Sequence, residues 1–355
     1  MSSTRRRRIL ALCAGLLAAI SLGAAAQAPY HFTALHGPGG SDGIANDLNG
    51  HGAIVGYSHP DGGNSHAMLW RRNAPVDLHQ LGVGSIARGV NRHLHVVGSI
   101  GVTIDEWRPA LWQEGVAALL PTLGGSFGLA HAIDNAGLIV GYSATAGNAE
   151  YHATRWVGGS PIDMGTLGGA NSSANAVNAL GDAAGYAQDS GNVVHAALWT
   201  ADGALIDLGT LGGSSSTATA INRKRWVAGY SEVNALFTTH AALWRDGIAI
   251  DLGTLGEGRN SFAWGIDHEG TVVGYSHTTN HNHAKDRRAT VWRAGVIADL
   301  NAWLDDATRA AGWVLLEARA INEDGVITGL ATNSITGKER AFRLTPTPSK
   351  EGASP

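Results

Sequence analysis

The sequence predicts an all-β protein, folded as a seven-bladed β-propeller of four-stranded blades. Three observations support this fold: a unit of about 44 residues recurs seven times, each unit holds four short apolar runs, and glycine is abundant at 49 of 355 residues. Four strands per unit of this length are typical of a propeller blade, and glycine supplies the positive φ angles that tight turns need. A β-solenoid is the alternative fold, although its coils are usually shorter.

The repeat is anchored by a glycine in segments that resemble Val-Gly-Tyr-Ser. This glycine recurs with spacings of 42, 43, 44, 44, 45 and 55 residues, at Gly56, Gly98, Gly141, Gly185, Gly229, Gly274 and Gly329. The residue seven positions before it is always Asn or Asp: Asn49, Asn91, Asp134, Asn178, Asn222, Asp267 and Asn322. The residue four positions earlier still is always alanine. Such constancy predicts positions where the backbone geometry is the same in every unit.

The four apolar runs of each unit predict four successive strands. The first run is similar to Ala-x-Ala-Ile-Asn, and its Asn or Asp and following glycine favour a hairpin turn. The second run is Val-Val-Gly-Tyr-Ser, followed by a polar loop of variable length. The third is His-Ala-Ala-Leu-Trp, which has apolar residues on both faces and therefore suits a sheet packed between two neighbours. The fourth is Asp-Leu-Gly-Thr-Leu, ending in Gly-Gly.

A decayed copy of the fourth run spans residues 30–40, before the first full unit. It allows the ring to close, either by completing the last blade or by opening the first. Only residues 301–312 favour a helix, and they account for the 55-residue spacing. We expect residues 27–346 to form one domain, followed by a polar tail over 347–355.

The first 26 residues predict a cleavable signal peptide. Four consecutive arginines precede an apolar run, and Ala24-Ala25-Ala26 fits a cleavage site. The arginines also loosely fit a twin-arginine signal. The single cysteine, Cys13, lies inside this segment, so we expect a mature chain without disulfides. The predicted location is secreted or periplasmic.

Charge limits the partners of the mature chain. Removal of the four signal arginines leaves 21 Lys and Arg against 29 Asp and Glu, a net charge of about −8. Nucleic acids and anionic membranes favour a basic surface, so neither is expected as a partner. No second apolar run of membrane length is present, and we expect a monomer that uses no cofactor.

The motifs resemble those of the HAF repeat family of extracellular bacterial proteins. The resemblance covers residues 30–346 and rests on the Ala-Ile-Asn, Val-Gly-Tyr-Ser, His-Ala-x-Leu-Trp and Asp-Leu-Gly-Thr-Leu-Gly-Gly segments. The His-Ala-Phe segment that names the family is mostly His-Ala-Ala here, with Arg340-Ala341-Phe342 at the end. The resemblance implies export and a repeat architecture, and it implies no catalytic residues.

A potentially cationic side chain begins the third run of every unit: His66, Arg108, His152, His195, His240, Arg288 and Arg340. These side chains could form an anion-binding belt. Their presence in all seven units favours a structural hydrogen bond to a nearby turn instead, because buried polar groups need partners.

The loops between the second and third runs differ most between units. We expect them to share one face of the ring with the Gly-Gly-Ser loops, and variable loops on a rigid scaffold often bind ligands. The candidate ligand-binding residues are Asp105, Glu106, Trp107, Glu150, Tyr151, His277, His281 and His283. Of these, the aromatic residues Trp107 and Tyr151 are expected to be exposed. The three histidines are also weak candidates for a metal site, although their spacing matches no metal motif.

The predicted function is a non-enzymatic binding scaffold for an extracellular glycan or protein. Two alternatives stay open: an enzyme acting on an extracellular polymer, with its site on the variable-loop face, and a structural component of the envelope or matrix. No catalytic constellation stands out in the sequence, and no sorting anchor is recognisable at the C-terminus.

Overall fold

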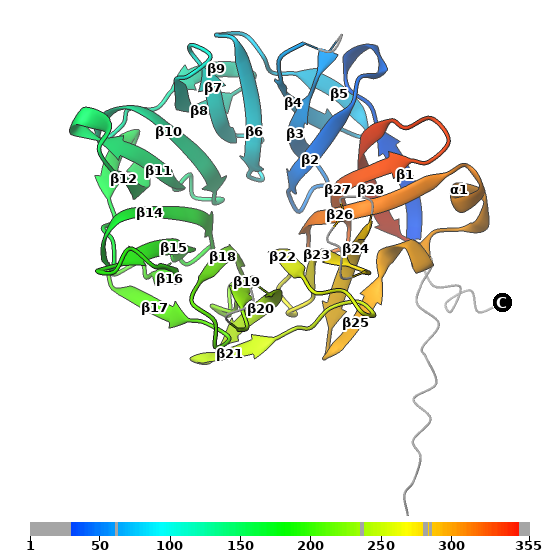
Figure 1. Cartoon of the computed structure of the whole chain (residues 1–355). Helices are drawn as coiled ribbons and strands as arrows, with labels where there is room; N and C mark the ends of the chain where they lie inside the picture. The colour runs from blue at the N-terminus through cyan, green and yellow to red at the C-terminus, as the bar shows by residue number, and fades with distance from the viewer. Residues whose placement is uncertain (1–29, 61–62, 235–237, 280–282, 284–285, 348–355) are drawn as a thin grey trace, which may run out of the picture.

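The chain folds into a ring of seven antiparallel four-stranded sheets around a central axis (Figure 1). This computed structural model describes residues 30–60, 63–234, 238–279, 283 and 286–347. The predicted signal peptide and most of the polar tail lie outside them. The seven-bladed β-propeller predicted from the repeat is confirmed. Within the described ranges, no helix has both the length and the apolar character to cross a bilayer.

Each blade runs from its innermost strand to its outermost strand in chain order. The first three blades are β2 (Gly43–Leu48), β3 (Ile54–Ser58), β4 (His66–Arg71) and β5 (Ala74–Asp77); β6 (Gly84–Val90), β7 (Val96–Gly101), β8 (Trp107–Gln113) and β9 (Val116–Leu119); and β10 (Gly124–Ile133), β11 (Ile139–Thr145), β12 (Tyr151–Val157) and β13 (Ser160–Asp163). The next three are β14 (Gly168–Val177), β15 (Ala183–Asp189), β16 (Val194–Trp199) and β17 (Leu205–Gly209); β18 (Ser216–Ile221), β19 (Val227–Glu232), β20 (Thr239–Arg245) and β21 (Ile248–Asp251); and β22 (Ser261–Ile266), β23 (Val272–His277), β24 (Arg287–Arg293) and β25 (Val296–Asp299).

The seventh blade joins the two ends of the described chain. Its inner three strands are β26 (Trp313–Ile321), β27 (Ile327–Asn333) and β28 (Glu339–Pro346), and its outermost strand is β1 (Tyr30–Leu35). Strand β1 pairs antiparallel with β28. Of the two closure arrangements left open by the sequence, the early copy therefore completes the last blade. The 55-residue spacing is filled by a 3-10 turn (Leu300–Trp303) and the short helix α1 (Asp306–Ala310), inside the range predicted to be helical.

Every innermost strand carries a β-bulge at the same place. In β2 the register passes from Ala45 opposite Gly56 to Asp47 opposite Val55, so Asn46 has no partner on β3. The same shift follows the constant alanine in the six other blades. A bulge bends its strand and redirects one side chain. The constant alanines are fully buried between blades.

The bulge explains why the anchoring glycine recurs. A Cβ atom built on any of the seven glycines would lie about 2 Å from a carbonyl oxygen of the innermost strand; for Gly229 the distance to the oxygen of Thr217 is 2.1 Å. No side chain fits in that space. The constant alanine directly opposite, Ala218 in this blade, is small for the same reason.

The constant Asn residues link the hairpin turns of neighbouring blades. The Asn49 carboxamide accepts backbone N–H bonds from His51 and Ala53 within its own turn. It also donates to the carbonyl oxygen of Asn91 in the next blade, at 2.9 Å. Equivalent bonds start from Asn91, Asn178, Asn222 and Asn322. Asn322 donates to the carbonyl oxygen of Asn49, which closes the ring across the chain ends.

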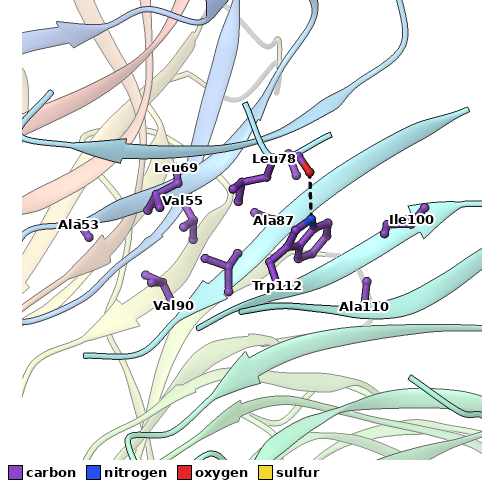
Figure 2. Packing of buried hydrophobic residues seen from close by; sticks show 11 residues of the cluster. Ala53, Val55, Leu69, Leu78, Ala87, Val90, Ile100, Ala110 and Trp112 are labelled. Carbon is purple, nitrogen blue, oxygen red and sulfur yellow. Dashed lines mark hydrogen bonds between the residues drawn. The ribbon is translucent and has the colours of Figure 1, made fainter. Parts of the chain in front are cut away.

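The interfaces between blades are apolar. Between the first two blades, Val55 and Leu69 pack with Ala87 and Trp112, and the Trp112 indole N–H donates to the carbonyl oxygen of Leu78 at 3.0 Å (Figure 2). Trp70, Trp156 and Trp199 make the same bond to the preceding blade. Each of these tryptophans is both a core residue and a hydrogen-bonded link between blades.

The histidines that begin the third strand make structural bonds. The Nδ1 atoms of His66, His152, His195 and His240 lie 2.7 to 2.8 Å from an aspartate on the fourth strand of the same blade. Arg340 instead pairs with Asp42 and donates to the carbonyl oxygen of Gly40. Of the two interpretations of this belt, the structure therefore favours hydrogen bonding to nearby turns.

Candidate functional site in the central channel

The seven bulged residues meet in the central channel of the ring. They follow the constant alanines and are Asn46, Arg88, His131, Asn175, Thr219, Trp264 and Arg319. Each blade contributes one of them, so the backbone places seven different side chains at equivalent positions. All seven are polar or carry a polar atom, although the alanine before each of them is fully buried.

These side chains line a cavity of about 280 Å³ together with Thr217, Tyr186 and Tyr230. Several of the lining groups already bind the neighbouring blade. The amide nitrogens of Asn46 and Asn175 donate to the carbonyl oxygens of Ala87 and Ala218, and the Thr219 hydroxyl donates to Ala263. These bonds fix the lining residues. The amide oxygen of Asn46 stays open as an acceptor, whereas that of Asn175 already accepts a bond from the Ser173 hydroxyl at 3.0 Å.

One side of the channel holds a charged and aromatic cluster. Glu317 is buried and accepts hydrogen bonds from Arg287 and from Arg319, whose Nη2 lies 2.7 Å from Oε2. The Arg319 guanidinium also lies over the ring of Trp264, 5.5 Å from its centroid. Two cations thus share one carboxylate, and the cluster carries a net positive charge. The Trp264 indole nitrogen is buried and has no partner among the described residues.

Arg88 lies in the same channel without a compensating charge. Its Nε atom is buried and unpartnered, and no described residue forms an ion pair with its side chain. Burial lowers the pKa of Arg88, and the charge of Arg319 acts in the same direction. A guanidinium keeps its proton despite such a shift, so Arg88 remains a cation.

His131 is the neutral neighbour of Arg88. Burial in the channel, followed by the charge of Arg88, lowers the pKa of His131 to about 3. Its imidazole is therefore uncharged at neutral pH and offers one donor and one acceptor nitrogen. The ring lies 5.7 Å from that of Tyr142, measured between centroids.

Tyrosines of the second strands extend this wall toward the variable-loop face. The Tyr186 hydroxyl lies 3.0 Å from that of Tyr151. Burial raises the pKa of Tyr186, and the bond from Tyr151 raises it further. Tyr230 contacts both Phe262 and Trp264, with centroids 5.0 and 6.1 Å apart. The channel therefore combines cations, amides and aromatic rings.

The loop residues predicted from the sequence lie in several different environments. The expected sharing of a face is confirmed in the third blade, where Asn148 of the variable loop accepts a bond from the backbone N–H of Ser126, in the Gly-Gly-Ser segment at the start of β10. Asp105 and Glu150 are exposed, and Glu106 lies 3.6 Å from Arg108.

The predicted aromatic residues are less exposed than expected. Trp107 is half-buried against Gly84 and Gly101, where a built Cβ would meet its ring at 3.3 and 3.2 Å. Tyr151 is also half-buried, and it contacts the channel wall through the hydroxyl of Tyr186.

The predicted histidines do not form a described cluster. His277 is buried, its ring is edge-on to Tyr275, and burial lowers its pKa. His283 is exposed, and His281 lies outside the described residues. Within the described ranges, no three His, Cys, Asp or Glu residues are grouped in a way that could hold a metal ion.

Sequence reasoning missed the channel residues. Their signal is present in the repeat: the position after the constant alanine varies among amide, cation, imidazole, hydroxyl and indole, whereas the alanine itself and the aliphatic residue three positions after it hardly vary. A polar residue that changes from copy to copy between constant positions indicates a surface that the framework does not need for packing.

The fold and the channel define the class: a seven-bladed β-propeller with a polar, cation-bearing central cavity. No protein-family model matches the sequence, and no curated protein matches it. Among solved structures, TolB from Acinetobacter baumannii is similar over 86% of this chain, with 10% identity and a TM-score of 0.47; the match spans 63% of TolB, less than two thirds of its length. The SapL1 lectin in complex with alpha methyl fucoside is similar over 87% of this chain and 97% of its own, with 12% identity and a TM-score of 0.38. The Trypanosoma rangeli sialidase in complex with the inhibitor DANA is similar over 90% of this chain and 55% of its own, with 11% identity and a TM-score of 0.40.

Proposed function

We propose that this protein is an exported, non-enzymatic binding protein that holds part of an extracellular glycan in its central channel. The observation that carries the proposal is the ring of seven bulged side chains. The framework positions repeat almost unchanged from blade to blade, whereas the seven lining positions differ and are polar. Binding sites commonly combine a rigid scaffold with a few oriented polar groups and an apolar or aromatic wall.

The chemistry of the lining suits a saccharide. The amide oxygen of Asn46 can accept a bond from a sugar hydroxyl, and the uncharged imidazole of His131 offers one donor and one acceptor nitrogen. The faces of Trp264 and Tyr230 offer apolar surface for the C–H face of a sugar ring. A volume of about 280 Å³ lies at the lower end of ligand cavities and fits one sugar unit rather than a long chain.

Export and a place among HAF repeat proteins belong to the same proposal. Their support is the signal-like segment over residues 1–26 and the repeat motifs over 30–346. The exposed loop residues Asp105 and Glu150 would contribute secondary contacts on the variable-loop face. Their role in binding stays a prediction.

A glycan array with three proteins tests the proposal. The mature chain is compared with Thr219→Trp, which fills the channel, and with Asp105→Ala/Glu150→Ala, which alters the loop face. We expect saturable binding by the mature chain and by the loop variant, and none by Thr219→Trp. Thr219→Trp loses the bond to Ala263 and should melt somewhat earlier, but it should keep the circular-dichroism spectrum of the folded mature chain. Loss of binding in the loop variant alone would move the site to the loops. A mature chain that binds no glycan would refute the proposal.

A further inference from the structure

We propose that the channel recognises an anionic saccharide, one whose carboxylate, sulfate or phosphate group pairs with the guanidinium of Arg88. This inference rests on the proposed function and specifies its ligand. It concerns one oxyanion placed beside one sugar ring, and it follows from the charges and unsatisfied donors of the channel lining.

The first step is the missing counter-charge of Arg88. A buried cation loses its hydration, and proteins usually offset this loss with an ion pair or hydrogen bonds. The cations on the other side of the channel follow this rule, because Arg287 and Arg319 share Glu317. The side chain of Arg88 has no such bond to any described residue, and its Nε is buried.

The second step is the shape and direction of the donor. The Nε atom of Arg88 is inaccessible to water, whereas its two terminal nitrogens are not buried. A guanidinium presents its N–H groups in one plane, as a fork. That fork matches two oxygens of a carboxylate, sulfate or phosphate. Arg88 and Arg319 line the same cavity, so an oxyanion there meets a positive field that Glu317 only partly cancels.

The third step is the sugar that carries the anion. His131 is uncharged and can bond to a hydroxyl or to the anion without adding charge. Trp264 lies on the wall of the same cavity with Tyr230 and Asn46, where the indole ring offers an apolar face and the Asn46 amide oxygen an acceptor. A saccharide that carries an anionic group beside its hydroxyls would therefore accept hydrogen bonds from the Arg88 guanidinium and contact the polar and aromatic groups of the cavity wall.

Calorimetric titration of the mature chain, Arg88→Gln and the control Arg71→Gln tests this assignment. Arg71 is exposed on strand β4, so its removal changes the net charge equally without touching the channel. The probes are glucuronic and galacturonic acid, glucose 6-sulfate, glucose 6-phosphate, and neutral glucose and galactose. We expect an anionic sugar to bind about 10- to 100-fold more tightly than its neutral parent, from the usual strength of charge-assisted bonds. Which esters or acids bind identifies the oxyanion.

Arg88→Gln has a second expected signature. The variant should lose the preference for the anionic sugar. Without ligand it should unfold at a slightly higher temperature, because it no longer holds a half-buried charge that has no described partner. Arg71→Gln should match the mature chain in both measurements.

The outcomes separate this inference from the proposed function. Equal affinity for neutral and anionic sugars, with binding lost in Thr219→Trp, would overturn the role of Arg88 and leave the channel proposal standing. Retained anion preference in Arg88→Gln would also overturn it, and so would a lower unfolding temperature of the free variant. Failure of every saccharide to bind the mature chain would refute both.

Discussion

Replacing the anchoring glycine of the fifth blade, Gly229→Ala, tests the explanation of the repeat. The new Cβ would lie 2.1 Å from the carbonyl oxygen of Thr217 and 2.8 Å from the Cα of Ala218. An ordinary carbon–oxygen contact needs roughly 3.3 Å, so strands β18 and β19 must separate by about 1 Å at this point.

The free-energy cost follows from that displacement. Overpacking of a tight interior costs about 1–3 kcal/mol, and one or two weakened ladder hydrogen bonds add about 1 kcal/mol each. We therefore expect Gly229→Ala to lower the free energy of unfolding by roughly 2–5 kcal/mol. Gly229→Val should cost more, because two further methyl groups meet the same backbone.

The assay is urea unfolding followed by circular dichroism, with Gly50→Ala as the control. Gly50 has no atom within 4 Å of a built Cβ and does not have a positive φ angle, so its substitution should stay within about 0.5 kcal/mol of the parent protein. If Gly229→Ala were as stable as Gly50→Ala, the close contact imposed by the bulge could not be the reason that this glycine recurs.

Three further predictions concern the ring. Burial raises the pKa of Asp47 to about 6 from an ordinary 3.8; the unfolded chain therefore ionises first, and stability falls as the pH rises from about 4 to about 6. Asp47→Asn should therefore be as stable as the parent protein below pH 4 and more stable than it at pH 7. For a pKa shift of about two units, the difference in the free energy of unfolding at pH 7 is at most roughly 3 kcal/mol. Equal stability of the two proteins at pH 7 would contradict this prediction. Asn322→Asp keeps the oxygen that accepts bonds within its own turn but loses the N–H donor that bonds to Asn49. We expect the free energy of unfolding, measured with a denaturant, to fall by about 1–2 kcal/mol. An unchanged unfolding midpoint would show that the bond to Asn49 contributes nothing. Deletion of one complete repeat should remove the soluble monomer in size-exclusion chromatography, and a folded six-repeat monomer would count against a ring that needs all seven blades.

The blade framework could be predicted because its geometry requires particular residues. Three residues recur at fixed positions in the repeat for this reason. They are the Asn whose side chain bonds its own turn, the glycine that faces a carbonyl oxygen, and the alanine opposite that glycine. The ring closure could not be predicted in the same way. Tyr30–Leu35 suits the outer edge of a blade in either arrangement, and only its pairing with β28 decides between them.

The candidate site was harder to predict because its signal is the absence of repetition. Asn46 or Arg88 alone is an ordinary polar residue in a short strand. The bulge that turns them into the channel arises from strand pairing, and regular alternation along the strand would have placed them differently. The variability of loop residues such as Trp107 predicts a binding role, yet the Trp107 ring packs against the backbone of Gly84 and Gly101.

The bulge also assigns fold stability and ligand recognition to different residues, whereas in most proteins the same residues must serve both. The side chain at each bulged position lines the channel, so a change there leaves the apolar contacts between blades in place and removes at most a few hydrogen bonds, such as that of Asn46 to Ala87. The alanine before it is fully buried between blades and tolerates almost no change. Seven independently variable positions around one cavity form a combinatorial surface that could acquire new specificities without losing the ring. A library randomised only at these seven codons would therefore be expected to keep a high folded fraction while its ligand preferences diverge.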